Sequence, residues 1–532
     1  MKTRICLFAS AALLSTAAFA QNQYDALRFL QRDLNGTARF VGMGGAMSAL
    51  GADLSTISTN PAGIGLYRSN DVSLSFGWNS NQAKTDWAGT NTTQKSDKMS
   101  FDQAGFVWTT KIGNKTDLRF MNFAFNYQKR ANFTRDFMAG GNLNGQSLTN
   151  QMANMMWNAG NSYGNAAYIT QSDFDALLDA DNPYIDYDYI GTPFLGAMGA
   201  RTGLVDPYPY DPEGLKNEEI QYFYGWDGND GTYYSREKGV ISEYDFNVSF
   251  NVKDRYYFGI TLGVYNINYS RYSSYAENFV NNEGGFSLDN WAKTEGVGVD
   301  LKLGAIIRPF EYSPFRIGLA VHTPIWYSLT DKYTSVLTSD FSSGITYTEN
   351  LSRYYGEPNY ILDYHLISPW RFNVSMGTTF SSVLAVDAEY EYETYNGTRL
   401  SDVDDNDFNG TYAIDETLKG VHTFRVGMEV KPIPEFSIRA GYYYKSSPIE
   451  DDSFKNIAAT DETRTDPEYF NLKSQQAVTF GVGFRSKSIY ADIAYKYAFA
   501  KADFYAFDSE DLVPAKVDAE RNQLLFTIGA RF

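Results

Sequence analysis

Alternating carboxylates are the densest group of chemically capable side chains in this 532-residue chain. Side chains two residues apart in an extended strand share one face, so these acids point the same way, as do arginines in neighbouring segments. The group comprises Asp387, Glu389, Glu391 and Glu393 with Arg371, Arg425 and Arg439. Such a group can form cross-strand ion pairs that stiffen a wall, or one guanidinium can bind the carboxylate of a ligand. We favour ion pairing, and both readings stay open at this point.

The sequence has no recognisable catalytic or metal-binding pattern. His322, His365 and His422 are far apart and fit neither a metal-ligand spacing nor a catalytic triad. Neither a G-x-S-x-G elbow nor an H-E-x-x-H helix occurs. The acidic run 402–407 lacks the turn glycine and the closing glutamate of a calcium loop, and we interpret it as a solvated loop. We therefore predict a protein that is not an enzyme, with no cofactor and no metal.

The N-terminus has the pattern of an exported protein. Residues 1–20 combine a basic start, a short apolar run and a small-residue cleavage site at Ala18-Phe19-Ala20, as secretory signal peptides do. Cleavage there would also remove Cys6, the only cysteine, and with it any disulfide chemistry. The formal charge of −18 at pH 7 makes nucleic acid an improbable partner.

After residue 70 the chain continues as a series of strands. In the last one, Leu524, Phe526, Ile528 and the terminal Phe532 fall on one face, and polar or small residues fall on the other. Exported barrels of Gram-negative bacteria end in this way, and the barrel-assembly machinery reads their last strand, so Phe532 is the predicted assembly signal. Fourteen such segments lie at about 71–80, 100–111, 117–130, 241–253, 255–270, 294–308, 314–327, 369–380, 382–395, 420–431, 435–446, 474–486, 488–503 and 519–532.

The connections between these segments alternate between long and short, as external loops and periplasmic turns do in outer-membrane barrels. The longest is the predicted external loop 131–240. We predict an all-β fold, a 14-stranded antiparallel transmembrane β-barrel over 71–532, in the outer membrane of a Gram-negative bacterium. An even number of strands places both termini in the periplasm.

A barrel of this size has a lumen too wide for its wall side chains to fill. Residues 21–70 precede the first strand, and their glycine-rich block 36–65 has neither strand nor helix periodicity. We predict that 21–70 form a hatch, a plug inside the lumen. Inward glycines of the wall, among them Gly259 and Gly304, would either clear a passage or let the hatch backbone approach closely.

The glycine-rich block also carries a family resemblance. It resembles the N-terminal hatch of the FadL/TodX family of outer-membrane transporters at Gly36, Arg39, Gly42, Gly44, Gly45 and Asn60-Pro61-Ala62-Gly63. The resemblance implies uptake of long-chain fatty acids or aromatic hydrocarbons by diffusion, with sideways release through an opening that a kink in the third strand makes. The third strand here, 117–130, has no Gly or Pro, so the sequence does not place this opening.

One segment of the long external loop has an apolar helical face. Met152, Met155 and Met156 recur at helical spacing beside Trp157, which suits the capture of varied hydrophobic molecules. The same face would serve equally to pack a small core within the loop. Packing is the reading that we favour.

The function predicted from the sequence is passive uptake of small hydrophobic molecules through a plugged, monomeric barrel. Its predicted partners are outer-membrane lipid and lipopolysaccharide, a small hydrophobic ligand and the barrel-assembly machinery. Two alternatives stay open: a haemin-binding outer-membrane receptor, and a barrel for secretion or protein interaction without small-molecule cargo.

Overall fold

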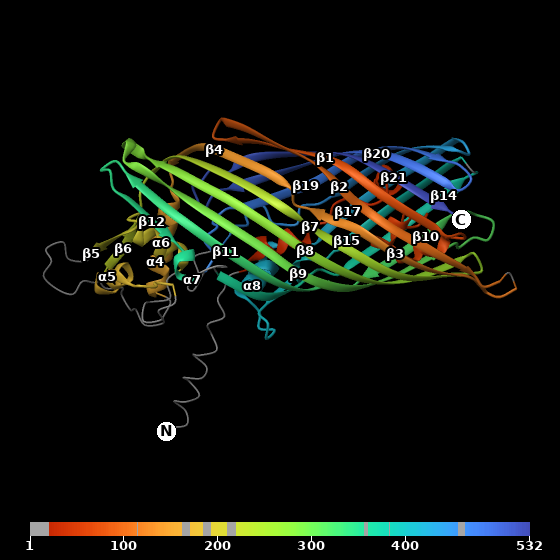
Figure 1. Cartoon of the computed structure of the whole chain (residues 1–532), viewed down its shortest axis with the longest axis horizontal. Helices are drawn as coiled ribbons and strands as arrows, with labels where there is room; N and C mark the ends of the chain where they lie inside the picture. Colours follow the sequence, from red (N-terminus) through yellow and green to blue (C-terminus); the bar gives the residue numbers. More distant parts are fainter. Residues whose placement is uncertain are drawn as a thin grey trace, which may run out of the picture.

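The computed structural model describes residues 21–113, 115–161, 171–184, 193–209, 220–355, 360–381, 383–455 and 463–532. Most of these residues form one antiparallel sheet that closes on itself, because β1 pairs with both β2 and the last strand, β21 (Figure 1). The sheet contains 19 strand segments. Four wall strands are each interrupted once and β12 is a side hairpin, so the wall has 14 strands. The predicted fold class is confirmed.

The wall strands follow one another in chain order around the barrel. They are β1 (Asp71–Trp87), β2 (Thr90–Lys111), β3 (Leu118–Asn132) continued by β4 (Arg135–Gly145), β7 (Gly228–Val252), β8 (Tyr256–Phe279), β9 (Gly284–Ile307), β10 (Arg316–His322) continued by β11 (Trp326–Phe341), β13 (Tyr360–Ile367) continued by β14 (Arg371–Phe380), β15 (Leu384–Glu393) continued by β16 (Arg399–Ser401), β17 (Val421–Ile433), β18 (Phe436–Lys445), β19 (Tyr469–Arg485), β20 (Ile489–Tyr505) and β21 (Ala515–Arg531).

Several strands are longer than the alternation of their residues predicts. The predicted loops 81–99 and 271–293 are strand almost throughout, and they turn only at Ala88–Gly89 and Val280–Glu283. The residues 131–240, predicted as one external loop, begin with the last residues of β3 and with β4, and end with the first half of β7. These outer halves lack an apolar face on the outside of the barrel, so the pattern that marks contact with lipid is missing while the backbone pairing continues.

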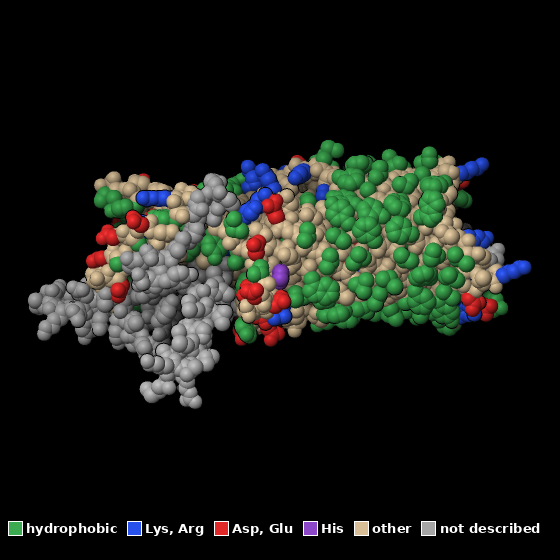
Figure 2. Space-filling view, turned by 60° about the horizontal axis from the view of Figure 1, so that its bottom comes forward, with side chains coloured by type: hydrophobic (Ala, Val, Ile, Leu, Met, Phe, Trp, Pro, Cys, Tyr) green, Lys and Arg blue, Asp and Glu red, His purple; other side chains and the backbone are tan. Residues whose placement is uncertain are grey.

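The outward face of the wall carries a band of apolar side chains. In β21, Phe526 and Ile528 are exposed outward, whereas the alternate residues Gln523 and Thr527 are buried in the lumen. Figure 2 shows this band on one face of the barrel, with charged side chains at its borders. The outward apolar and inward polar alternation is that of a membrane-spanning barrel.

The hatch residues 21–70 lie inside the lumen as short helical turns. They comprise α2 (Gln23–Leu30), α3 (Ala38–Gly42) and the 3₁₀ turns η1 (Leu54–Ser58) and η2 (Pro61–Leu66). Each begins at a polar residue whose side chain accepts a hydrogen bond from the next turn: Asn22, Thr37, Asp53 and Asn60. The sequence thus caps four very short turns that contacts with the wall then hold in place.

A lid of short elements covers one end of the barrel. It consists of α4 (Leu148–Asn161), α5 (Gln171–Asp179), α6 (Phe194–Arg201) and the hairpin of β5 (Asp206–Pro209) and β6 (Ile220–Tyr224). The remaining short elements are η3 (Val280–Asn282), β12 (Thr346–Asn350), α7 (Ser352–Tyr355), η4 (Tyr395–Gly397) and α8 (Asn409–Thr417). Among the described residues, no helix is long and apolar enough to cross a membrane.

Candidate transport pathway

The Asn-Pro-Ala segment docks the hatch onto β7, β8 and β9. The Asn60 side chain accepts from the Ala62 N–H at 3.1 Å and donates to the Ala305 carbonyl at 3.3 Å. The Pro61 carbonyl accepts from the Ser249 hydroxyl at 3.0 Å. Two wall glycines make room for this contact.

A side chain at either of these wall glycines would collide with the hatch. A Cβ on Gly259 would overlap the Pro61 carbonyl, and one on Gly304 would overlap the Asn60 amide oxygen. These two glycines therefore let the hatch backbone approach the wall closely, which is the second of the two roles expected for them. Gly63 completes the turn, since its N–H donates to Asn60 and its carbonyl accepts from Ala52.

The glycine run packs the hatch against the opposite wall. Gly44 has φ of +66°, and a Cβ there would lie 2.8 Å from the Tyr442 nitrogen of β18, so only glycine fits. The Gly42 carbonyl accepts from the Thr479 hydroxyl of β19 at 3.1 Å. Gly45 lies against Leu34 and Arg425, and Gly36 lies against Ser55.

Arg39 ties this part of the hatch to the wall. Its Nε lies 3.1 Å from Glu429 Oε2, and its Nη1 donates to the Ala52 carbonyl at 3.0 Å. The same Glu429 oxygen accepts from Arg439 at 2.7 Å, and Arg439 also pairs with Asp492. The predicted lumenal residue Arg439 is thus held by two wall carboxylates.

The acidic ladder of β15 is paired along its whole length. Asp387 accepts from the hatch N–H groups of Ala49 and Leu50 at 3.1 and 2.9 Å. The partners of the other three acids are Arg425 and Ser48 for Glu389, Arg425, Arg371 and Arg32 for Glu391, and Arg32 and Lys445 for Glu393. Arg371 also contacts His322, which bonds the Thr59 carbonyl at 3.1 Å. The acids of the ladder thus lie in a network of ion pairs, and the hatch residue Arg32 is an additional member of this network.

The third wall strand is interrupted at Phe133–Thr134, between β3 and β4. β2 pairs with β3 only up to Gln103–Gln128, and in the described part of the chain β4 pairs with β7 alone. The outer half of β2 is therefore left with a neighbour on one side only, and Met99 in it is 78% exposed. The backbone pairing of the wall is thus interrupted between β2 and β4, and this interruption is called the gap below.

The strand breaks although it contains neither Gly nor Pro at this point. The Asn132 side chain accepts from the Thr134 N–H at 3.1 Å in a local turn, and the pairing with β7 shifts register between Lys129 and Ala131. β4 then lies on the lumen side of β1 and β2. Its Met138 carbonyl accepts from the hydroxyls of Thr85 and Thr92 at 3.0 and 2.6 Å.

Hatch residues replace β2 at the gap. The Asp33 N–H donates to the Arg130 carbonyl at 2.8 Å, and the Asp33 carboxylate accepts from the Asn132 N–H at 3.0 Å. The Asn35 amide donates to the Lys129 carbonyl at 3.1 Å. Backbone groups that would otherwise need a strand partner or water are thereby satisfied by the hatch.

A cavity of about 260 Å³ adjoins the gap on the lumen side. Hatch residues, the strand break and the small side chains of β1, β20 and β21 line it, among them Leu27, Phe133, Ala83, Ala500 and Ala519. Two of its cations are paired with acids that line the same cavity: Arg135 with Glu237, and Arg521 with Asp33 at 2.8 Å. A cavity of about 150 Å³ with apolar walls holds a benzene molecule, so this one has room for a somewhat larger hydrophobic guest.

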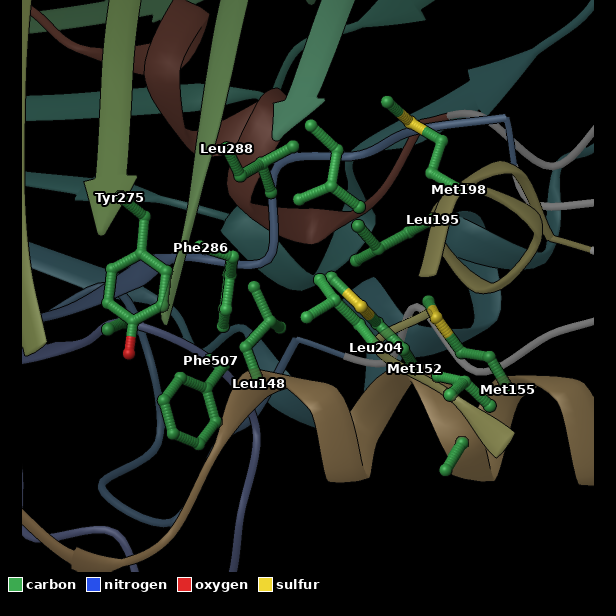
Figure 3. Close-up of a cluster of buried hydrophobic side chains, with 14 of the residues drawn as sticks. Leu148, Met152, Met155, Leu195, Met198, Leu204, Tyr275, Phe286, Leu288 and Phe507 are labelled. Atoms are coloured by element: carbon green, nitrogen blue, oxygen red, sulfur yellow. The ribbon is translucent and has the colours of Figure 1, made fainter. Parts of the chain in front are cut away.

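The predicted capture face lies in the core of the lid. Met152, Met155 and Met156 are buried, and Trp157 is 36% exposed. Figure 3 shows Met152 and Met155 packed with Leu195 and other lid residues. Their position matches packing within the loop.

The two ends of the described chain lie at different positions along the barrel axis. Phe532 exchanges backbone hydrogen bonds with Asn70, beside the start of β1. Gln21, within the lumen, donates to Asp331 of β11 at 2.8 Å. The predicted signal peptide, residues 1–20, lies outside the described residues, and the periplasmic position of both termini stays a prediction.

The loop between β18 and β19 fastens this start of the hatch. Arg464, between β18 and β19, lies 3.4 Å from Asp25 and also contacts Gln21. Burial by itself raises the pKa of the Asp25 carboxyl. Arg464 and Arg28 lower the pKa by more than this, so that it lies below its ordinary value. Among the described residues, no group of three or more His, Cys, Asp or Glu side chains is placed to hold a metal ion.

The structure is similar to the crystal structure of a FadL homologue from Pseudomonas aeruginosa, with a TM-score of 0.52. That match covers 94% of this chain and 99% of the other, at 12% sequence identity. The chain has the FadL fold. The toluene transporters TodX of P. putida and TbuX of Ralstonia pickettii match over 94% of this chain and 99% of theirs, with TM-scores of 0.48 and 0.43 and identities of 12% and 13%. No protein-family model and no curated protein matches the sequence.

Within this FadL fold, sequence reasoning missed the residues at the gap. Asp33 and Asn35 belong to the predicted hatch, but nothing in their spacing connects them to the third strand about a hundred residues later. The one local signal was Asn132, a residue type that favours turns.

Proposed function

We propose that the protein is an outer-membrane channel for small hydrophobic molecules, which diffuse in from the lid side and leave sideways between β2 and β4. The observation that carries this proposal is the gap itself, which adjoins a cavity and is bridged by hatch residues instead of a wall strand. The hatch resemblance and the FadL fold support the outer-membrane location and the class of cargo.

The proposed sideways path depends on which parts of the wall and hatch can move. A wall strand is held by hydrogen bonds along both edges, whereas β4 has a partner on one edge only among the described strands. A shift of residues 31–35 would release the edge of the third strand and connect the cavity to the lipid around Phe101 and Tyr127. The rings of these two residues stack at 5.4 Å where the pairing of β2 with β3 ends. A neutral guest then needs no energy source, because it moves from one apolar environment to another.

Reconstituted protein tests the proposal directly. Flux and binding of a labelled fatty acid, an aromatic hydrocarbon and haemin are compared with those of empty liposomes. Ala500→Trp, which places an indole in the cavity, is expected to reduce the flux of the transported molecule at least tenfold. Ala491→Trp, on the outward face of the same strand, is the matched control and should transport normally.

Three outcomes count against the proposal. Flux equal to that of empty liposomes for all three molecules removes the channel function, and haemin binding alone supports the receptor alternative. Equal flux through the two tryptophan variants places the path elsewhere in the barrel.

A further inference from the structure

A basic groove lies on the outer wall of the barrel, across β7, β8, β9 and β11. The strand register places Lys238, Ser270, Lys293 and Lys332 in one row, and Arg236, Tyr272, Trp291 and Thr334 in the next row toward the lid. Adjacent strands are about 4.8 Å apart, so each row spans about 14 Å. The groove has a volume of about 340 Å³, with the small side chain of Ser270 between the lysines.

These side chains point away from the lumen. The side chains of Arg236 and Lys293 are 52% and 47% exposed, and Lys332 is 35% exposed. Their sequence neighbours Glu237, Thr294 and Asp331 are buried on the inner face instead. Four cations therefore lie together on the outside of a chain whose formal charge is −18.

The groove borders the apolar band of the barrel. Along β9, Val297 and Val299 are exposed outward, and Lys293 lies four residues before Val297, about 13 Å along the strand. Trp291 is also exposed and packs against Tyr272, with ring centroids 5.3 Å apart and the ring planes tilted by 40°. Aromatic side chains of this kind occupy the interface between lipid and water. The groove thus lies at the level of lipid headgroups on the lid side.

Three carboxylates face the same area. Glu295 lies 2.7 Å from Lys293 and 3.6 Å from Lys332, and Asp136 lies 2.8 Å from Arg236. Asp289 accepts from the Tyr272 hydroxyl at 2.8 Å. Among the described residues, Lys238 has no acidic partner. Because solvent-exposed ion pairs are weak, these cations can exchange a carboxylate for a phosphate of higher charge.

We propose that this groove binds the phosphorylated disaccharide headgroup of lipid A in the outer leaflet. The lysine row and Arg236 would contact its phosphates, and Trp291 and Tyr272 would pack against the sugar and the first methylene groups. The inference rests on the proposed outer-membrane location, with the lid end outward. It gives the predicted lipopolysaccharide partner a site on the wall, independent of the lumen.

Binding of defined lipids to the detergent-purified barrel tests this site. The probes are bisphosphorylated lipid A, the same lipid without phosphates, and inorganic phosphate, and bound lipid is counted by native mass spectrometry. The triple variant K238Q/K293Q/K332Q should bind bisphosphorylated lipid A at least tenfold more weakly. The control K84Q/K501Q/K516Q removes three exposed lysines of β1, β20 and β21 that are also paired with acids, and should bind normally.

A second variant tests the site with the opposite sign. Glu295→Gln removes the carboxylate beside Lys293 and Lys332, so it should bind lipid A several-fold more tightly. Equal binding by all variants, equal binding of the dephosphorylated lipid, or displacement by millimolar inorganic phosphate would each overturn the proposal. Hydrophobic flux does not enter these measurements, so failure of the transport proposal would be recognised separately.

Discussion

At the residue scale, Asp33 supplies hydrogen-bond partners to β3 that a neighbouring wall strand supplies elsewhere in the barrel. It satisfies the backbone of β3 at Arg130 and Asn132 and pairs with Arg521 of β21. One hatch residue thus links the edge of β3 to β21, two strands beyond β2 in the wall. Hydrogen bonds to a charged acceptor are stronger than those between neutral groups, so the closed state depends on this carboxylate.

Replacing Asp33 by Ala should therefore favour the open gap. The Asn132 N–H loses its acceptor, and the Arg521 guanidinium keeps only the Asn79 side-chain oxygen at 3.4 Å. An unpaired donor costs about 1–3 kcal/mol when it is fully buried, and less at this partly buried site. We expect hydrophobe flux through proteoliposomes to rise at least twofold while the barrel stays folded. Asp33→Asn, which keeps an acceptor oxygen but loses the charge, should have a smaller effect. Unchanged flux in Asp33→Ala would show that this contact does not control the gap.

At the scale of elements, the strands contacting lipid could be predicted and their extensions could not. Contact with lipid forces outward residues such as Phe526 to be apolar, which leaves a readable alternation. The outer half of β2 is polar on both faces, so nothing in its residues distinguishes a strand from a loop. The pairing of the acidic ladder followed from the same alternation, whereas its partner Arg32 comes from the hatch and could not be placed.

The break between β3 and β4 was unpredictable for a different reason. It is not made by a residue that breaks strands but by contacts between segments that are distant in sequence, such as Asp33 with Arg130. Tertiary contacts of this kind leave no periodic signal in a single sequence. The local turn at Asn132 becomes meaningful only once the hatch is in place.

The acidic ladder of β15 makes a prediction at this scale. Glu391→Gln removes the buried carboxylate that Arg32 and Arg425 share, and leaves each of them with one acid, Glu393 and Glu389. Removing one partner of a buried ion pair typically costs about 3–5 kcal/mol, and the two remaining acids lower this cost. We expect a clear fall in the urea midpoint of unfolding in detergent or lipid. Glu450→Gln, which breaks an exposed pair with Lys419, is the control and should change little. If Glu391→Gln instead alters only fatty-acid binding, the ladder is a ligand site and not a structural network.

The whole molecule combines a wall that holds itself together with a hatch that depends on the wall. The ion pairs of Arg425 with Glu389 and of Arg439 with Asp492 lie between wall strands. The hatch, by contrast, consists of turns too short to be stable alone, and its Asn-Pro-Ala segment is held by β7 to β9. The wall should therefore keep its fold without the hatch, but the hatch should not fold without the wall.

Deleting residues 21–70 while keeping residues 1–20 tests this order of dependence. The wall would retain its 14 strands, since each is paired along most of its length within the sheet, and water would fill the lumen that the hatch now occupies. We expect the shift of the folded barrel in unheated gel electrophoresis to be preserved and single-channel conductance in planar bilayers to rise severalfold. Because Asp33 and Asn35 are lost, the gap beside β3 should also become accessible to a hydrophobic photo-crosslinker added to the lipid. A folded barrel with the conductance of the intact protein would mean that residues 21–70 do not block the lumen, and a barrel that cannot fold would mean that the hatch is part of the wall's own stability.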